Sequence, residues 1–437
     1  MYNKPGGFTT RHAAVAALAA AALMMTGCTS SPTQPTTTPP SSGAAPSSAP
    51  TTAEPVTITY GIWDQRQQPA MEAIAAAFTA IHPNVTIKIE LAPYSQYFTK
   101  LQTAASGGAA ADVFWMNGPN FQLYASNGML APLDDAGVNK ADYTDALTAL
   151  YTYDGKLYGA PKDFDTIALW YNKALFDKAG VAYPKAGWTW ADMKAAAKAL
   201  TDPAKGQWGI AASPYGQENY YDSIAQAGGY VISADGKKSG YGSPEALAGI
   251  KLWTDLIAEG SSPTLQQMND TAPETVFLSG KIAMFQAGSW AAKAYSTSDV
   301  AADLAVAPLP AGPAGSISVV HGLANVVFAR SPHLDVAKAF AAFASSKTAA
   351  DIMAASGTVI PAVNGTQQTW VEALPQYDLK VYIDALSNAV PYPVSKNTSA
   401  WATVEADIIT KIWAGEVDPA AGLKDLATQM QALLDAE

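Results

Sequence analysis

Side chains that perform covalent or metal chemistry are scarce in this sequence. Its 437 residues contain one cysteine, Cys28, and four scattered histidines. No HExxH, GxSxG, Walker-A or GxGxxG pattern opens a helix after a strand. Aromatic side chains are abundant instead, with 11 tryptophans and 20 tyrosines. Flat rings bury apolar faces at low entropic cost, and neighbouring amides or carboxylates add directed hydrogen bonds. The residue types therefore favour noncovalent recognition over catalysis, with neither a metal nor another cofactor.

Tryptophan and polar side chains occur together in two short segments, WDQRQ at residues 63–67 and WMNGPN at residues 115–120. Each follows an apolar run, rich in β-branched or aromatic residues, that predicts a buried strand. Helical patterns begin near Pro69 and Tyr94, so the order is strand, helix, strand, helix, strand. This order predicts a mainly parallel sheet with helices on both faces. Ligands of such sheets bind outside the carboxyl ends of the strands, so we expect both segments at one site.

The spacing of apolar residues predicts the elements around these segments. Met71, Ile74, Phe78 and Ile81 recur at helical spacing and form a predicted face that packs on the sheet. Residues 84–91 alternate between apolar and polar side chains, which predicts a half-buried strand. Later helices are predicted at residues 189–200 (with Thr189 as N-cap), 243–259, 333–346 and 418–437.

The start of the chain has the pattern of an export signal. Lys4 and Arg11 precede an uncharged apolar run over residues 13–25. This run is shorter than the roughly 20 residues of a membrane-spanning helix and suits the core of a signal peptide. The small residues ahead of Cys28 resemble the lipobox of bacterial lipoproteins, in which the signal is cut before a cysteine that then receives lipid. We therefore expect a signal peptide at residues 1–27 and lipidation of Cys28.

Composition separates a spacer from a folded body. Residues 28–55 are rich in Ser, Thr and Pro and hold no aromatic or large aliphatic residue, so they predict an extended tether. The body from Val56 onward is long enough for two lobes and contains no cysteine, which excludes disulfides. The formal charge is −11, and loss of the signal with its two cations leaves −13. An acidic chain without basic clusters argues against nucleic acid as a partner.

The body resembles the extracellular solute-binding proteins of ABC importers, in the sugar-binding group that includes maltodextrin-binding protein. The resemblance rests on an ordered series of segments: GIWD, DVFWMNGPNFQLYASNGMLAPLDD, DGKLYGAPKDFDTIALWYNKALFDKAG, AQAGGYVIS, VFLSGKIAMFQAGSW, HGLANVVFAR and SAWATVEADIITKIWAGEVDPAAGLKDL. It implies an α/β fold of two lobes, each a mainly parallel sheet flanked by helices, which close about hinge crossings over a ligand. The implied boundaries are 56–164 and 322–375 for lobe 1, and 165–321 and 376–437 for lobe 2.

The same resemblance implies partners and a site. It implies a carbohydrate ligand, permease subunits of an ABC importer, no catalytic activity, and a lipid-anchored monomer on the extracellular face of the membrane. Trp290 of the G-x-W turn and Trp401 of the tail segment are implied to stack on sugar rings. Gly118 and Pro119 replace the Asp-Arg pair of the maltodextrin binder, so maltodextrin itself is not implied. The implied ligand-binding set is Trp63, Gln65, Gln67, Trp115, Asn117, Asp163, Asp165, Glu218, Tyr220, Trp290, Gly322 and Trp401.

Packing roles compete with ligand roles at several of these and other positions. Trp115 follows Phe114 in a predicted strand and fits either role, and His321 fits a packed hinge residue better than a ligand contact. The two acids at 163 and 165 fit either ligand binding or hinge hydrogen bonding. Other residues are predicted to have structural roles alone: Trp170, Trp253 and Trp413 in the core, Trp188 and Trp190 at a helix entry, and Asp134 and Asp135 in a solvated turn.

Two alternatives to a sugar receptor follow from the residues. A receptor of the same fold could bind a charged solute, such as a polyamine or a phosphorylated polyol. A secreted hydrolase acting on glycosides would need two carboxylates facing each other across the scissile bond, roughly 5–10 Å apart. Asp163 and Asp165 are two residues apart on one predicted strand, and no second acid is clearly placed opposite them. The aromatic and mixed polar set fits a neutral sugar better than either alternative.

Overall fold

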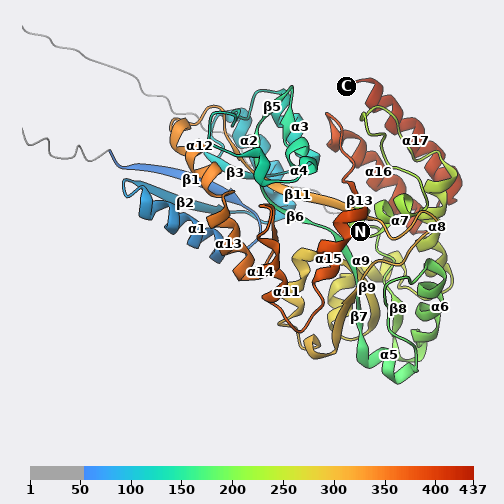
Figure 1. Ribbon diagram of the computed structural model, residues 1–437. Coiled ribbons are helices and arrows are strands. Elements are labelled where there is room, and N and C mark those ends of the chain that lie inside the picture. Colours follow the sequence, from blue (N-terminus) through green and yellow to red (C-terminus); the bar gives the residue numbers. More distant parts are fainter. Residues whose placement is uncertain (1–53) are drawn as a thin grey trace, which may run out of the picture. The chain divides into compact units, whose positions relative to one another are not determined.

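The structure, a computed structural model, describes residues 54–437 (Figure 1). The predicted export signal, Cys28 and almost all of the predicted tether lie outside the described residues. The described part of the chain is built on a seven-stranded sheet and a four-stranded sheet, with a separate two-stranded hairpin. Within it, no helix is long and apolar enough to cross a membrane.

The larger sheet has the strand order β12-β6-β11-β3-β1-β2, with β13 paired to β11. β1 pairs in parallel with β2 and β3, as the strand and helix order predicts. β11 is antiparallel to both β3 and β6, so the complete sheet is mixed. The strands are β1 (Val56–Ile62), β2 (Val85–Leu91), β3 (Val113–Asn117), β6 (Gly159–Asp165), β11 (Ser318–Val327), β12 (Ile360–Pro361) and β13 (Ala389–Pro391).

The smaller sheet has the order β10-β7-β9-β8. Only β8 and β9 are parallel, so the expectation of a mainly parallel sheet is wrong here. The reason is that β7 runs away from the first sheet, whereas β9 and β10 return toward it. The strands are β7 (Ile167–Asn172), β8 (Trp208–Ile210), β9 (Ile282–Gly288) and β10 (Leu304–Ala307), and the hairpin consists of β4 (Thr152–Tyr153) and β5 (Lys156–Leu157).

Helices cover both faces of each sheet. One core of the larger sheet lies under α1, α12 and part of α13, and another lies under α2 and α3. The cores of the smaller sheet lie under α6, α8, α16 and α17 on one face, and under α10, α11 and α14 on the other. The helices are α1 (Gln68–Ile81), α2 (Tyr94–Gly107), α3 (Gly118–Ser126), α4 (Asp145–Leu150), α5 (Lys173–Ala179), α6 (Trp190–Leu200), α7 (Tyr221–Gln226), α8 (Pro244–Ala258), α9 (Leu265–Asp270), α10 (Pro273–Leu278), α11 (Ala292–Tyr295), α12 (Leu334–Phe343), α13 (Lys347–Ser356), α14 (Gln367–Glu372), α15 (Lys380–Asp384), α16 (Thr398–Trp413) and α17 (Pro419–Asp435).

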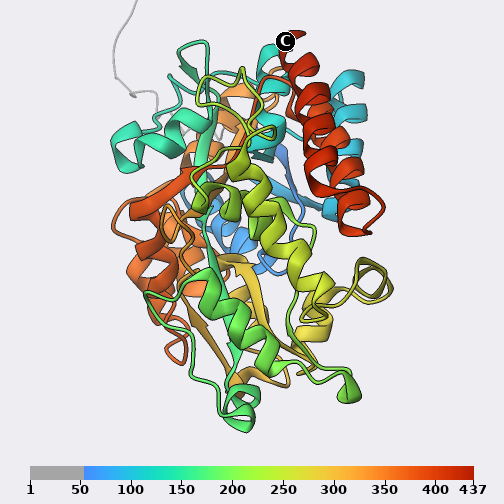
Figure 2. The ribbon, with the colours of Figure 1, turned by 90° about the vertical axis from the view of Figure 1, so that its right-hand side faces the viewer.

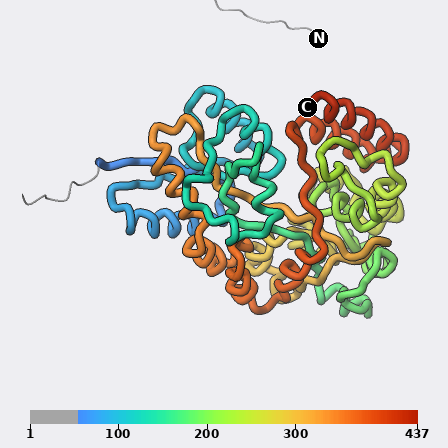
Figure 3. The backbone as a smooth tube through the Cα atoms, turned by 45° about the horizontal axis from the view of Figure 1, so that its top comes forward, coloured from blue at the N-terminus to red at the C-terminus, as the bar shows by residue number. Residues whose placement is uncertain are grey.

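Segments far apart in sequence share the core of the smaller sheet that lies under α6, α8, α16 and α17, which is called the second core from here on. The C-terminal helices α16 and α17 run side by side, drawn in red in Figure 2. α17 packs against α8, and residues of all three helices share one core. The yellow-green segment of α8 lies beside the red helices in Figure 3. The tail of the chain thus belongs to the same core as residues that precede β11.

Local features follow the sequence pattern closely. Thr189 caps α6 in a capping box with Asp192. The tryptophans at 170, 253 and 413 are buried, as predicted. Trp188 and Trp190 are half-buried and pack against the core that contains Trp253 and Trp413, and the acids at 134 and 135 are exposed in a turn. Ile81, placed on the packing face of α1, is 62% exposed because it ends the helix beyond the covered part of the sheet.

The chain passes between the two sheets by short connections. β6 leads into β7 through the single buried residue Thr166. Residues 308–317 connect β10 to β11, and residues 392–397 connect β13 to α16. The first connection lies next to the lobe boundary implied at residues 164 and 165, and the lobe boundaries themselves stay a prediction.

A buried carboxyl lies in the second core. Glu405 on α16 is 4% exposed and accepts a hydrogen bond from the Tyr221 hydroxyl at 2.8 Å and another from the Tyr241 hydroxyl. Burial raises the pKa of Glu405 to about 7, although both hydrogen bonds oppose the rise. The charged form of this side chain is therefore penalised in the folded protein.

We predict that stability falls as pH rises because of this residue. Its folded pKa of about 7 exceeds the ordinary value of 4.5, so its contribution is fully present below about pH 4.5 and is lost as pH rises through 7. The full shift corresponds to about 3 kcal/mol. Glu405→Gln, which stays neutral, should reduce the loss of unfolding free energy between about pH 5 and pH 8, measured by urea unfolding. An identical pH slope in wild type and variant would contradict this assignment.

Candidate functional site

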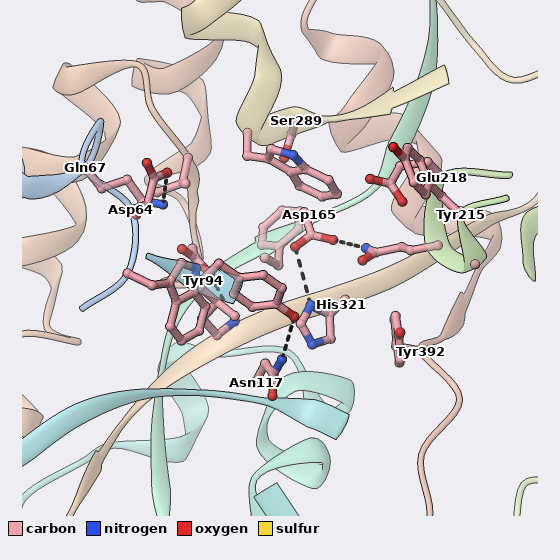
Figure 4. A pocket seen from close by; sticks show the side chains of 18 of the residues that line it. Asp64, Gln67, Tyr94, Asn117, Asp165, Tyr215, Glu218, Ser289, His321 and Tyr392 are labelled. Carbon is pink, nitrogen blue, oxygen red and sulfur yellow. Dashed lines mark hydrogen bonds and ion pairs between the residues drawn. The ribbon is translucent and has the colours of Figure 1, made fainter. Parts of the chain in front are cut away.

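A cavity of about 600 Å³ lies where strands of the two sheets end (Figure 4). Aromatic rings and polar side chains share its wall. Its lining residues are Trp63, Asp64, Arg66, Gln67, Tyr94, Asn117, Asp163, Phe164, Asp165, Pro214, Tyr215, Gly216, Gln217, Glu218, Ser289, Trp290, His321, Leu323, Val359 and Tyr392.

Strand ends bring these residues together. Residues 63–67 follow β1, Asn117 ends β3, Asp165 ends β6, and the Ser289-Trp290 turn follows β9. Strand pairing places two of these strand ends beside Thr166, where the chain passes from the larger to the smaller sheet. His321 on β11 is paired with Asp165, and Gly288 is paired with the first residue of β7.

The wall from the larger sheet is a cluster of aromatic rings. Trp63 is half-buried and contacts the rings of Tyr94, Tyr97, Phe98 and Trp115 at centroid distances of 4.9–5.8 Å. Tyr94 remains 58% exposed beside it. Exposed rings of this kind supply apolar area to a ligand at a low entropic cost.

The floor contains a buried ion pair. Lys162 Nζ lies 2.5 Å from Asp163 Oδ2, donates to Gln67 Oε1 at 2.9 Å and lies 4.4 Å from the centroid of the Trp115 ring. Asp163 also accepts from the backbone N–H of Leu323 at 3.0 Å. Burial raises the pKa of Asp163, and the Lys162 ammonium opposes this rise. Both oxygens of Asp163 are therefore bonded within the protein, one to Lys162 and the other to the backbone of Leu323.

Asp165 has only neutral partners. It accepts from the side-chain amide of Gln217, and its Oδ2 lies 3.6 Å from Nδ1 of His321. The other ring nitrogen of His321 accepts from the backbone N–H of Gly118 at 3.1 Å, so the ring proton lies on Nδ1 and faces Asp165. The histidine is 7% exposed and its ring packs on Tyr392 at 4.9 Å, so it is a packed residue that also lines the cavity.

Glu218 comes from the π-helical turn η3 (Gly216–Tyr220). Figure 4 shows it beside Tyr215, at the opposite end of the view from Asp64 and Gln67. Loss of contact with water raises the pKa of Glu218 to about 7, and the nearby carboxylates of Asp165 and Glu274 add to the rise. This end of the cavity disfavours a second negative charge.

Trp290 is positioned by the glycine two residues before it. A Cβ atom added to Gly288 would lie 2.0 Å from the Trp290 ring, so the indole lies directly over this glycine. Trp290 is half-buried and lines the cavity. The intervening Ser289 is 1% exposed, and its buried hydroxyl has no hydrogen-bond partner among the described residues.

Seven of the twelve implied ligand residues line the cavity, and five do not. The expectation for Trp401 is wrong in this structure, because α16 turns its ring into the second core, where it is 0% exposed and its indole donates to Ser395 Oγ at 2.9 Å. Trp115 is also 0% exposed, donates to the Tyr60 hydroxyl at 2.6 Å and supports Trp63 from behind.

The other three positions differ in their reasons. Tyr220 is 4% exposed and packs on Trp413, because the π-helical turn directs it into the core. Gln65 is exposed to solvent at the edge of its loop. Gly322 does not line the cavity, but a Cβ there would lie 2.5 Å from the carbonyl oxygen of Asp163, so close strand packing requires glycine.

Sequence reasoning missed several lining residues. Asp64 and Arg66 belong to the polar segment of residues 63–67, and their place in this segment is the signal that points to a site role. Tyr94 and Tyr215 are exposed aromatics at the start of helical segments, which is a weak signal. The sequence around Tyr392 gives no signal of a site role, because only the folded chain brings this residue to the cavity. Among the described residues, no group of three or more His, Cys, Asp or Glu side chains could hold a metal ion.

The chain belongs to the bacterial extracellular solute-binding protein family, whose model matches residues 63–351. Solved structures share the two-lobed fold. An ABC substrate-binding protein from Listeria monocytogenes in complex with cycloalternan has a TM-score of 0.82 at 27% identity, covering 87% of this chain and 100% of that one. The GacH receptor of Streptomyces glaucescens, solved unliganded and with acarbose, has a TM-score of 0.78 at 26% identity, covering 87% and 99%.

A relative with a similar sequence is also a solute-binding protein of an ABC transporter. The maltooligosaccharide ABC transporter solute-binding lipoprotein of Streptococcus pneumoniae is 25% identical over 343 residues, covering 75% of this chain and 78% of its own. The family and these relatives are binding proteins and not enzymes. The protein is therefore an ABC-transporter solute-binding protein with sugar-binding relatives.

The different positions of the two tryptophans lead to a stability prediction. Trp401→Ala should lower the free energy of unfolding by about 3–5 kcal/mol, because it removes a fully buried ring. Trp290→Ala should cost less than half as much, because one face of its ring borders the cavity. Urea unfolding of both variants without ligand measures the difference. Equal losses would contradict the placement of Trp290 at the cavity wall.

Proposed function

We propose that this protein captures a carbohydrate, as a mono- or oligosaccharide or a glycoside, and delivers it to an ABC permease. The observation that carries the proposal is the Trp290 ring, held over Gly288 at the cavity and accompanied by the Trp63 and Tyr94 rings of the other sheet. Rings of this kind bury the C–H faces of a sugar, while Gln67 and Asn117 offer donors and acceptors to its hydroxyls. The ligands named for its relatives, such as cycloalternan and maltooligosaccharides, support the same class.

Closure about the connections between the sheets completes this proposal. Cavity residues come from both sheets, so a ligand that contacts both favours the closed arrangement by its differential affinity. The implied residues that line the cavity, namely Trp63, Gln67, Asn117, Asp163, Asp165, Glu218 and Trp290, are the proposed site. Trp115 and Gly322 support it without lining the cavity.

A phosphorylated polyol as ligand and a glycoside hydrolase activity have less support than the binding of a neutral sugar. A phosphorylated polyol needs a free cation, but Arg66 is paired with Asp64 at 3.3 Å and Lys162 with Asp163. A glycoside hydrolase needs two available carboxyls, which Asp165 and Glu218 could supply, but the matching family and the matching structures are binding proteins. A cationic solute remains compatible with the acids of the cavity.

Sugar binding and the position of the Trp290 ring are tested together. A thermal-shift screen with maltooligosaccharides, cycloalternan and other oligosaccharides should raise the melting temperature, since ligand at 100 times its Kd adds about 2.7 kcal/mol. Gly288→Ala should then weaken the best ligand at least about tenfold in calorimetric titration, because the new Cβ displaces the ring. The backbone at Gly288 (φ −74°, ψ 163°) accepts alanine without strain.

Gly107→Ala is the matched control, because a Cβ there meets nothing within 4 Å. It should leave the affinity unchanged. Equal affinities of Gly288→Ala and wild type would argue against stacking on Trp290, and a screen without any binding sugar would argue against the function itself.

We further propose that the protein acts as a lipid-anchored monomer on the extracellular face of the membrane. The support is the predicted signal over residues 1–27, the cysteine that follows it and the Ser/Thr/Pro-rich tether of residues 28–55. The lipoprotein from Streptococcus pneumoniae agrees with this location. A tether of this composition would hold the binding lobes near a permease while leaving them free to turn.

In an exporting bacterium, Cys28→Ala should move the protein from the membrane fraction to the soluble fraction. The reason is that the variant lacks the thiol to which lipid would be attached. Fractionation followed by immunoblotting measures this, with Gly288→Ala as a variant that should remain at the membrane. Equal membrane association of the Cys28→Ala variant and wild type would overturn the anchor.

A further inference from the structure

The acids of the cavity differ in whether a cation neutralises them. Asp64 pairs with Arg66 at 3.3 Å, and Asp163 pairs with Lys162 at 2.5 Å. Asp165 has only Gln217 and the neutral His321 ring as partners. No ion pair or side-chain hydrogen bond joins Glu218 to any described residue. Two of the four lining acids therefore lack a cation.

The two acids without a cation lie in the same part of the cavity. Gln217, the residue directly before Glu218, donates to Asp165, so the two acids lie in one region of the cavity. The carboxylates of Asp165 and of exposed Glu274 both contribute to the raised pKa of Glu218. Uncompensated charge away from water is unfavourable, and either a proton or a bound cation relieves it. In Figure 4, Asp165 lies at the centre of the view, with Glu218 and Tyr215 to one side.

An independent observation indicates that a polar ligand binds at this end. Ser289 lines the cavity and is 1% exposed, and its buried hydroxyl has no hydrogen-bond partner among the described residues. A buried hydroxyl without a partner is unusual, because buried polar groups are almost always hydrogen-bonded. Tyr215, which is 41% exposed, and Trp290 add aromatic rings whose faces attract cations.

We propose that Asp165, Glu218, Ser289 and the rings of Tyr215 and Trp290 form a subsite for a protonated amino group carried by the sugar. The ammonium forms charge-assisted hydrogen bonds with both carboxylates. The Ser289 hydroxyl bonds a neighbouring group of the ligand. The preferred ligand is then an amino sugar or an oligosaccharide with a basic amine. This inference rests on the proposed function and specifies its substrate class.

Matched ligand pairs test the subsite. Calorimetric titration compares glucosamine with N-acetylglucosamine, chitobiose with N,N′-diacetylchitobiose, and acarbose with maltotetraose. In at least one pair the basic member should bind about tenfold tighter or more, the usual effect of a charge-assisted hydrogen bond. Glu218→Gln should reduce this preference to about threefold or less, whereas the exposed Glu416→Gln variant should preserve it.

Each outcome decides a separate point. If the neutral member of every binding pair binds as tightly as the basic one, or if Glu218→Gln keeps the preference, the amine subsite is wrong and the sugar-binding function stands. If no member of any pair binds, the proposed function fails along with the subsite. The melting temperature of Glu218→Gln without ligand should equal or exceed that of wild type, because the penalised charge is removed. A lower value would indicate a structural role for Glu218 instead.

Discussion

The passage from β6 to β7 through Thr166 is the constraint on which the site depends. One buried residue joins the two sheets, and its side-chain hydroxyl donates to the carbonyl of Tyr382 at 2.7 Å. The carbonyl of Thr166 accepts from the backbone N–H of Ser289 at 3.2 Å. The turn that carries Trp290 is therefore attached to the connection itself. Because strands of both sheets are aligned at this point, side chains from distant parts of the sequence reach one cavity.

Charge gives the two sides of the cavity different properties. Away from the crossing, Asp64 and Asp163 are neutralised within the protein, by Arg66 and by the buried Lys162 respectively. Lys162 of the buried pair also donates to Gln67, so the polar groups of the floor are preoriented. Near the crossing the carboxylates have only neutral partners, and loss of solvent raises the pKa of Glu218. Binding strength thus comes from rings on both sheets, whereas selectivity for charge is concentrated on Asp165 and Glu218.

Aromatic residues show how far local pattern reaches. Trp63, Trp290 and Trp401 all lie at the ends of helices or strands beside small or polar residues. The local sequence therefore does not distinguish a ligand role from a core role at these positions. The structure separates them, because α16 packs on α17 and turns Trp401 into the second core, which also contains residues of α8. The Trp115 ring is excluded in the same way, since β3 is buried on both faces. Residues between two strands or helices can face either the core or the cavity, and only packing decides which.

The sequence by itself determined the α/β class, most of the helices and strands, the capping of α6 and the membership of the solute-binding family, because these depend on local periodicity and on ordered motifs. It also predicted that polar and aromatic residues at the ends of β1 and β3 lie together, and the family resemblance added those at the end of β9. Tertiary structure alone decided the antiparallel pairing of β7, β9 and β10 and the contribution of Tyr392. It also decided which acids are neutralised by cations. These features depend on contacts between residues far apart in the chain, and no local pattern encodes the distance between them.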